Sequence, residues 1–163
     1  MKTAIIYATS HGTSEKVARL IAEGLKSNTV DLFNLKKKPK IDISAYDTIV
    51  IGGSIHAGTP AGVLRKFINK NMLSLLQKKV ALFLCCMNQP EEQTEFDVAF
   101  PEYLRSHSVY NTIAGGEYVF EEMNFIEKAI IRKITGATES LSKLRYEEIQ
   151  KLVNCLNSEI VKN

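Results

Sequence analysis

The chain has 163 residues, of which 45% are hydrophobic and 24% are charged, and its formal net charge at pH 7 is +3. This length suits one domain over residues 1–163 that buries its own core, and the composition is that of a globular protein. The sequence has no apolar run of about 18 residues, and its first residues form a short, strand-like run, so we expect no transmembrane helix, no secretory leader and a cytoplasmic location. The mild charge lacks the dense basic stripe of a nucleic-acid-binding protein, so we expect no nucleic-acid partner.

The three cysteines, Cys85, Cys86 and Cys155, predict reduced thiols. Three cysteines cannot all pair within one chain, and their spacing does not match that of zinc ligands, so we expect no metal site. Because neighbouring residues of a strand point in opposite directions, the side chains of Cys85 and Cys86 should lie on opposite faces of a sheet.

Strand-like and helix-like patterns alternate along the chain. Apolar, β-branched runs predict strands at residues 3–7, 29–35, 48–51, 80–85 and 110–114. Apolar residues at helical spacing predict helices at 17–25, 63–68 and 146–161. Thr59 and Pro60 predict the start of the second helix, as N-cap and first helical residue. A further helical stretch at 92–106 should be broken or kinked by Pro101.

This alternation predicts an α/β fold, with a doubly wound parallel sheet of five strands and helices on both faces. Ligands of such sheets bind at the carboxyl ends of the strands. The basic cluster from Lys36 to Lys40 falls in the loop after the second strand. A solvated turn is the expected role for it, and contact with a phosphate or another anionic partner is the alternative.

The segment YATSHGTSEKVA, at residues 7–18, carries the strongest chemical signal. Its turn contains four hydroxyl side chains, which belong to Thr9, Ser10, Thr13 and Ser14. Gly12 allows a tight bend, and the N–H groups at the start of the next helix favour an anion such as phosphate. The alternative is that Thr13 or Ser14 only caps the helix. The glycine-rich, lysine-containing loop of nucleotide hydrolases and the three-glycine turn of dinucleotide-binding proteins are both missing from the sequence.

The same segment resembles the FMN-phosphate signature of the flavodoxins. Tyr7 ends the first strand, a turn rich in Thr and Ser follows, and Ser14 and Ala18 stand four residues apart. The resemblance implies FMN as cofactor, the strand order 2-1-3-4-5, and two loops that clasp the flavin ring after the third and fourth strands. The cofactor-binding residues that it implies are Thr9, Ser10, His11, Gly12, Thr13, Ser14, Ser54, Ile55, His56, Ala57, Gly58, Cys86, Met87 and Asn88.

The rest of the chain is similar to the menaquinone-dependent protoporphyrinogen oxidase family, which has the flavodoxin fold. The similarity lies in the Ser54 to Gly58 loop, the loop containing Asn88, and the segment IAGGEYVFEEMNFIEKAIIRKITGATES at 113–140. It implies an FMN-dependent oxidoreductase whose partner is a redox protein, a quinone or a small-molecule substrate.

Charged residues bear on the substrate that this resemblance implies. His56 is the candidate catalytic residue, because it is placed to bond the flavin edge or relay a proton; a solvent-facing loop histidine is the alternative. Glu117, Glu121 and Glu122 stand in a region where that family tends to be rich in arginine and tyrosine. Glutamates there disfavour an anionic porphyrin carboxylate.

Apolar residues at helical spacing predict an amphipathic helix within 123–136. We expect it to pack on its own domain or against a second copy in a homodimer. Peripheral contact with a membrane surface, or with a quinone-handling protein, is the alternative, because Lys128, Arg132 and Lys133 flank the apolar residues.

Two other functions compete with an oxidoreductase. An electron carrier without its own substrate is disfavoured by the positive charge and the absence of Trp. A receiver-type or cofactor-free interaction module could share the strand order. A receiver needs carboxylates at the ends of the first and third strands, where this chain has Tyr7-Ala8 and Ile51-Gly52-Gly53.

Overall fold

The structure, a computed structural model, describes residues 1–26, 29–56, 59–60 and 62–158, with only the backbone of residues 56, 59 and 60. A parallel sheet runs through its centre in the order β2-β1-β3-β5-β6, and β4 pairs antiparallel with the end of β3. These strands are β1 (Lys2–Ala8), β2 (Thr29–Asn34), β3 (Thr48–His56), β4 (Thr59–Pro60), β5 (Lys79–Cys85) and β6 (Tyr110–Ile113). The five predicted strands and their 2-1-3-4-5 order are confirmed.

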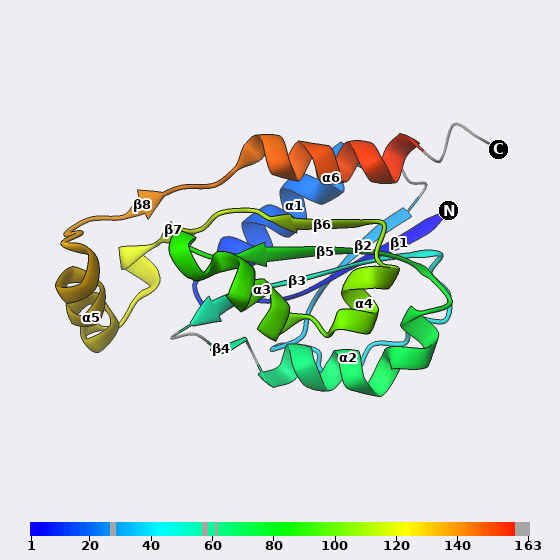
Figure 1. Cartoon of the computed structure of the whole chain (residues 1–163), viewed down its shortest axis with the longest axis horizontal. Coiled ribbons are helices and arrows are strands. Elements are labelled where there is room, and N and C mark those ends of the chain that lie inside the picture. Colours follow the sequence, from blue (N-terminus) through cyan, green and yellow to red (C-terminus); the bar gives the residue numbers. More distant parts are fainter. Residues whose placement is uncertain (27–28, 57–58, 61, 159–163) are drawn as a thin grey trace.

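Helices cover both faces of the sheet (Figure 1). One face packs against α1 (Thr13–Gly24) and α6 (Tyr146–Ser158), and the other packs against α2 (Gly62–Leu75), α3 (Glu92–Ala99) and α4 (Glu102–His107). Successive strand residues enter opposite cores, as Ile5 and Ile6 do in β1. Cys85 belongs to the core under α1 and α6, whereas Cys86 belongs to the core under α2 to α4. The prediction that these two thiols lie on opposite faces is confirmed.

Two predicted helix boundaries were based on proline residues, and the structure tests both. The helical stretch at 92–106 is divided into α3 and α4, with Pro101 directly before α4, so the predicted break is confirmed. The predicted helix start at Thr59 and Pro60 is wrong, because these residues form β4 and α2 begins at Gly62. The backbone at 59–60 pairs with Ile55 and His56 of the elongated β3, an extended conformation that Pro and the β-branched Thr both favour. Residues 159–161 of the predicted last helix lie outside the described residues.

A lobe of residues 117–142 projects beyond the carboxyl ends of the parallel strands (Figure 1). It contains β7 (Glu117–Tyr118), the short 3₁₀ helix η2 (Phe120–Glu122), α5 (Phe125–Thr135) and β8 (Leu141–Ser142), and β7 pairs antiparallel with β8. The pairing continues toward the sheet, since Lys143 N donates to Gly116 O at 2.8 Å and Arg145 N donates to Ala114 O at 2.9 Å. The lobe is therefore attached to the end of β6 by a backbone ladder.

Helix α5 confirms the amphipathic helix predicted within 123–136. It begins with a capping box, in which Asn124 and Glu127 each accept a hydrogen bond from the other's backbone N–H, and it ends at Thr135, with Gly136 as its left-handed C-cap. Its outer face exposes the large apolar side chains of Phe125 (83%), Ile126 (68%) and Ile130 (49%), and Ile134 near its end is 75% exposed. Within the described ranges, neither α5 nor any other helix is long and apolar enough to cross a membrane.

Candidate cofactor site

Residues 9–14, named here the phosphate loop, join β1 to α1. Gly12 is the N-cap residue of α1 with a φ of 85°, a left-handed conformation in which a side chain is strained. The bend is closed by Gly12 N, which donates to Thr9 Oγ1 at 3.0 Å. Thr13 and Ser14 lie inside the first turn of α1 and make no capping bond. The alternative in which one of them only caps the helix is therefore wrong.

The phosphate loop presents unused hydrogen-bond donors. Lys16 N is the first helical N–H to bond, to Gly12 O at 2.9 Å, so the N–H groups of Thr13, Ser14 and Glu15 have no partner within the helix. The Ser14 hydroxyl is fully buried beside the Cys85 thiol, a weak partner, and forms no hydrogen bond of ordinary geometry with the described residues. Because a buried hydroxyl without a good partner is costly, an anion with several acceptor oxygens fits this loop.

A cavity of about 410 Å³, named here the ring cavity, lies beside the phosphate loop between the ends of β3 and β5 and the lobe. Such a volume is in the range of small-molecule sites. Seven of the predicted cofactor residues line it, namely His11, Thr13, Ser54, Ile55, Cys86, Met87 and Asn88. Thr9, Ser10 and Gly12, together with His11, line a neighbouring cavity of about 670 Å³, which shares His11 and Glu117 with the ring cavity. The structure thus places three separate predicted loops around one region.

The remaining predicted residues of the β3 loop are less completely described. His56 is the last residue of β3, at the same edge of the sheet, and nothing further is described of its side chain. Ala57 and Gly58 lie outside the described residues. The catalytic role of His56 and the cofactor contacts of Ala57 and Gly58 stay predictions.

Cys86 and Glu95 form a polar pair at one wall of the ring cavity. The Cys86 thiol donates to Glu95 Oε2 at 2.7 Å, and Asn88 Nδ2 donates to Glu95 Oε1 at 3.4 Å. Burial, with the neighbouring Glu95 carboxylate, raises the pKa of the Cys86 thiol to about 12. The thiol is therefore protonated and unreactive at neutral pH. Glu95 was not predicted, because nothing in the sequence pattern of α3 distinguishes it from the other acidic residues of that helix.

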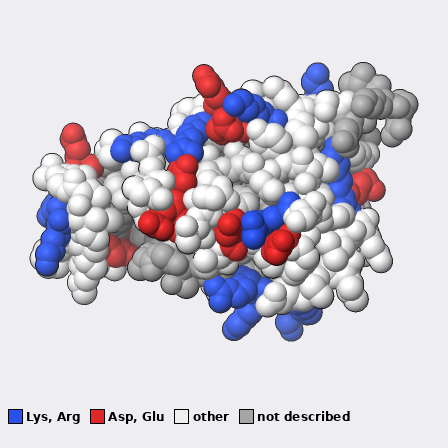
Figure 2. Space-filling model, viewed as in Figure 1, with Lys and Arg blue, Asp and Glu red and all other residues white. Residues whose placement is uncertain are grey.

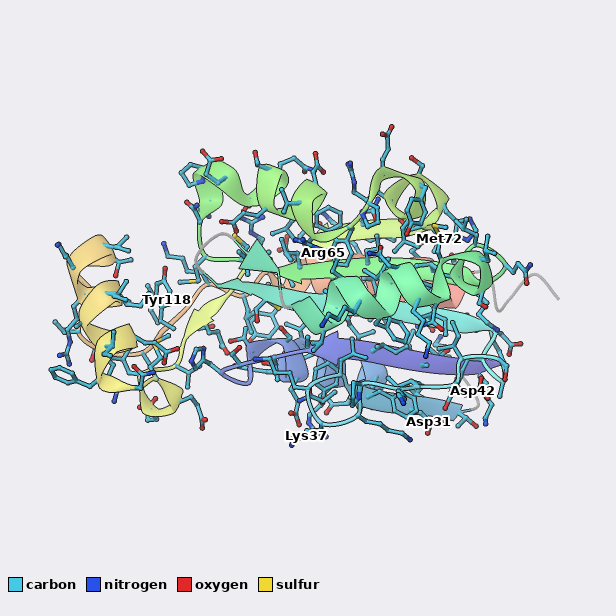
Figure 3. The ribbon with its side chains drawn as sticks, turned by 90° about the horizontal axis from the view of Figure 1, so that it is seen from below. Asp31, Lys37, Asp42, Arg65, Met72 and Tyr118 are labelled. Carbon is cyan, nitrogen blue, oxygen red and sulfur yellow. The ribbon has the colours of Figure 1, made fainter. Side chains whose placement is uncertain are left out.

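The lobe supplies a wall that the motif-based prediction also missed. Tyr118 lies between the strand ends and α5 (Figure 3), and burial raises the pKa of its hydroxyl. Met123, Ile131 and Ile134 add apolar surface from the lobe. The aromatic-rich character of 118–125 was visible in the sequence, but its position against the strand ends was not. Among the described lining residues, the tyrosine thus comes from the lobe, and the two predicted ring loops contribute no Tyr, Phe or Trp.

Two polar links hold the lobe against the phosphate loop and the first turn of α1. His11 Nε2 lies 3.3 Å from a Glu127 carboxylate oxygen. Lys16 Nζ donates to Glu117 Oε1 at 2.7 Å, and Ser142 Oγ donates to the same oxygen at 2.7 Å. The lobe, the phosphate loop and the ring cavity therefore form one continuous site.

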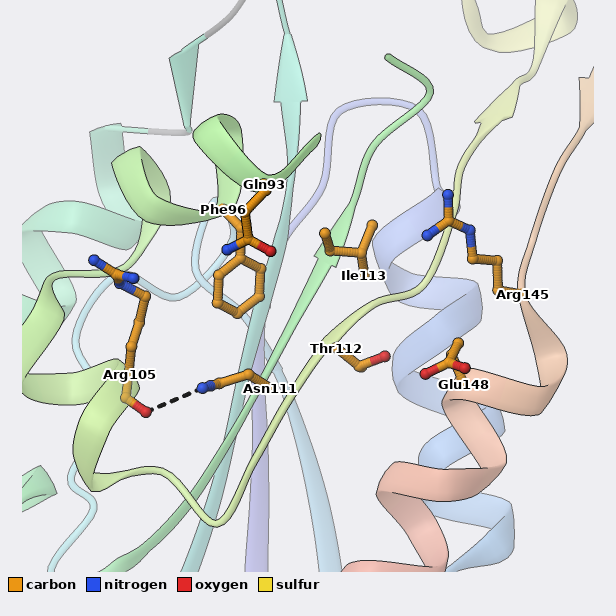
Figure 4. Close-up of a pocket in the computed structure, with 8 residues that line it drawn as sticks. All are labelled: Gln93, Phe96, Arg105, Asn111, Thr112, Ile113, Arg145 and Glu148. Carbon is orange, nitrogen blue, oxygen red and sulfur yellow. Dashed lines mark hydrogen bonds between the residues drawn. The ribbon is translucent and has the colours of Figure 1, made fainter. Parts of the chain in front are cut away.

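A third cavity, of about 440 Å³, lies at the edge strand β6 between α3, α4 and α6 (Figure 4). Its two arginines are already paired, because Arg145 bonds both oxygens of Glu92 at 3.0 and 2.6 Å and Arg105 bonds Asp97 at 2.7 Å. It contains no residue of the phosphate loop or the ring cavity. Its location and its internally compensated charge make it a poorer candidate for the cofactor.

The sheet order, the phosphate loop after β1 and the ring cavity at the strand ends define a flavodoxin-type domain. The family model of the flavodoxin domain matches residues 4–143, and the chain belongs to this family. This match confirms the predicted family, whose cofactor is FMN.

Individual relatives are distant. The chain is 23% identical over 167 residues to protoporphyrinogen IX dehydrogenase [quinone] from Escherichia coli strain K12, covering 94% of this chain and 92% of that protein. Among solved structures it resembles oxidised flavodoxin 2 from Bacillus cereus, with a TM-score of 0.64, 20% identity and full coverage of both chains. It also resembles rubredoxin oxygen:oxidoreductase from Desulfovibrio gigas, with a TM-score of 0.63 and 15% identity. That match covers 99% of this chain but 36% of the larger protein, so it supports the fold alone.

Proposed function

We propose that this protein binds FMN across the phosphate loop and the ring cavity and acts as an oxidoreductase. One observation carries the proposal: a helix start with unused N–H donors adjoins a cavity lined by the two loops at the ends of β3 and β5. A phosphate and an attached planar ring need these two environments side by side. Bound FMN would supply the electron-transfer chemistry, and the protein would bind, orient and shield it.

The proposed contacts follow from the lining of the site. The N–H groups of the α1 start and the hydroxyls of the phosphate loop would hold the phosphate. Ile55 and Met87 would contact the ring from the strand ends, and Tyr118 would contact it from the lobe. Ile131 and Ile134 of α5 would exclude water from the same space. The protonated Cys86 thiol would present no charge to the ring.

The ring cavity favours an uncharged partner. Of its two carboxylates, Glu117 is paired with Lys16, whereas Glu95 accepts only from the neutral Cys86 and Asn88, and no Lys or Arg belongs to the described lining. Carboxylates facing a substrate disfavour a second carboxylate, so this lining suits a neutral ring such as a quinone better than a carboxylate-bearing porphyrinogen. The Escherichia coli relative is named for a quinone, which is consistent with this partner class. We therefore propose a quinone as the redox partner of the bound flavin.

The outer face of α5 supports a proposed location at a membrane surface, where quinones reside. Phe125 and Ile126 are largely exposed there, Ile130 is about half exposed, and Arg132 and Lys133 lie in the last turn. Figure 2 shows basic side chains, with acidic ones among them, at the end of the molecule where α5 projects. An amphipathic, basic helix of this kind suits the interface of an anionic bilayer.

The first test is a titration of the purified protein with FMN and with riboflavin, followed by flavin fluorescence. We expect tight, saturable FMN binding that Gly12→Val weakens far more than it weakens riboflavin binding, because the substitution strains the phosphate loop. Absence of FMN binding at micromolar protein would refute the proposed function.

The partner is tested with the FMN-loaded protein, reduced without oxygen and mixed with a water-soluble quinone. We expect a reoxidation rate that saturates with quinone concentration. Ile131→Asn should raise the half-saturating concentration because Ile131 lines the cavity, whereas Ile126→Asn on the outer face should not. A rate that never saturates, with normal reaction with a carrier protein, would instead indicate an electron carrier.

A further inference from the structure

A lysine of the basic cluster after β2 lies on the phosphate loop. Lys36 Nζ donates to Ser10 Oγ at 2.6 Å, although the two residues are 26 positions apart in the chain. Lys36 and Ser10 both line the 670 Å³ cavity beside the loop, together with Thr9 and Gly12. A full positive charge thus stands where the loop itself offers only hydroxyl and N–H donors.

The backbone fixes this lysine relative to the loop. Leu35 N donates to Tyr7 O at 2.8 Å, which ties the end of β2 to the end of β1. The Asn34 side chain accepts from Lys36 N at 3.0 Å, and the Asn34 carbonyl accepts from the next two N–H groups at 3.0 and 2.8 Å. The turn that carries Lys36 is therefore built onto the strand that leads into the phosphate loop. Lys37, the following residue, is labelled in Figure 3 at the periphery of the same turn.

The other charges around the cavity leave Lys36 available for an anion. Two of the three carboxylates that line the cavity are paired, because Glu117 bonds Lys16 at 2.7 Å and Glu15 bonds Arg19 at 2.7 Å. The third carboxylate, Glu122, is matched in the same lining by the additional cation Lys37. Across the described ranges Lys36 has no carboxylate within ion-pair distance, and its bonding partner is the neutral Ser10 hydroxyl. Because Ser10 Oγ accepts from Lys36, the Ser10 O–H remains able to donate to a ligand oxygen.

We propose that Lys36, which is hydrogen-bonded to Ser10, selects a phosphorylated ligand because its positive charge attracts the phosphate dianion. This inference rests on the proposed FMN site and adds a residue to it from the loop after β2. Charge-assisted hydrogen bonds are stronger than neutral ones, and partly exposed charges are screened by salt. The discrimination between FMN and riboflavin should therefore depend on Lys36 and on ionic strength.

The test compares FMN and riboflavin binding to the wild type, Lys36→Gln, Lys36→Arg and the control Lys38→Gln. Lys38 belongs to the same turn, but its ammonium lies over the Phe33 ring, 5.4 Å from the ring centroid. We expect Lys36→Gln to weaken FMN binding about tenfold, as loss of a charged hydrogen bond implies, and to leave riboflavin binding within about twofold. Lys36→Arg should retain most of the FMN affinity, and Lys38→Gln should match the wild type.

Salt gives an independent measurement. Between about 0.05 and 0.5 M NaCl, FMN affinity of the wild type should fall, and the fall should be smaller in Lys36→Gln. Unchanged FMN affinity in Lys36→Gln, or equal losses for FMN and riboflavin, would overturn the role of Lys36 while leaving FMN binding intact. A wild type that binds no FMN would instead overturn the proposed function itself.

Discussion

The three cysteine side chains occupy environments of different reactivity. Burial raises the pKa of the Cys85 and Cys86 thiols to about 12, and their side chains are 3% and 5% exposed. Cys155 is partly exposed in α6. Since the thiolate is the reactive form, the two buried thiols should resist modification.

We therefore expect one thiol to react rapidly with a disulfide reagent such as DTNB at about pH 8, and all three to react after unfolding. The released chromophore measures this directly. Cys155→Ser should remove the rapid phase and leave the slow thiols unchanged. Rapid reaction of two thiols in the wild-type protein would contradict the burial of Cys85 or Cys86.

Some site residues could be predicted from the sequence because their signal is local. The phosphate loop joins one strand to one helix, so hydroxyls, glycine and helix start are adjacent in the chain. Glu95 and Tyr118 could not be found in this way, since Glu95 lies nine positions after Cys86 on a different element and Tyr118 reaches the strand ends only through the lobe. Lys36 was visible as part of a basic cluster, but its bond to Ser10 depends on the pairing of β2 with β1.

Among the elements, strand β3 depends on a close approach to β5. A Cβ atom added at Gly52 would overlap the ring of Phe83, which is fully buried on the neighbouring strand. We expect Gly52→Ala to lower the free energy of unfolding by about 1–3 kcal/mol, because the packed ring has no room to move. Urea unfolding measures this change, provided that the variant and the wild type have the same slope of unfolding free energy against urea concentration.

Gly62 is the matched control, at the first residue of α2, where an added Cβ would have no heavy atom within 4 Å. Gly62→Ala should remain within about 0.5 kcal/mol of the wild type or be slightly more stable. Similar losses of unfolding free energy in the two variants would show that the change in backbone flexibility, and not the Phe83 contact, causes the loss.

Periodicity predicted most elements, and its failures have tertiary causes. Thr59 and Pro60 carry a good local helix-start signal, but antiparallel pairing with the end of β3 overrides it. The spacing of apolar residues predicted α5, yet it could not reveal that Ile131 faces the ring cavity while Ile126 faces outward. A hydrophobic period identifies a helix, whereas its docking position depends on contacts made by the rest of the chain.

At the scale of the whole molecule, the alternation of elements was sufficient to predict the sheet and its layers. The lobe is different, because the ladder that carries it joins residues 114–116 to 143–145, and neither segment has a strong strand pattern. The extension of one domain over residues 1–163 stays a prediction. The site is assembled at the junction of the predictable sheet and this less predictable lobe.

The free energy of unfolding should fall at alkaline pH, because the core contains buried groups that ionise by losing a proton. The pKa of Cys85 rises from 9.0 to about 12 on burial, and burial with the Asp31 carboxylate raises the pKa of Tyr46 from 10.0 to about 12. Groups with a raised folded-state pKa contribute stability that is complete below the unfolded pKa and is lost as pH rises toward the folded value. Stability should therefore be level up to about pH 8.5 and fall between about pH 9 and 12.

Ionisation of the Cys85 thiol alone should lower the free energy of unfolding by about 1 kcal/mol at pH 10, because the unfolded thiol is then mostly ionised and the folded thiol is not. Urea unfolding at several pH values should show the loss in the wild type. Cys85→Ala should be less stable at neutral pH, since it leaves a small cavity, but its stability should decline less steeply above about pH 9. Cys155→Ala should keep the slope of the wild type. An equally steep decline in Cys85→Ala would mean that the alkaline sensitivity arises elsewhere, with Tyr46 and its bond to Asp31 as the next group to vary.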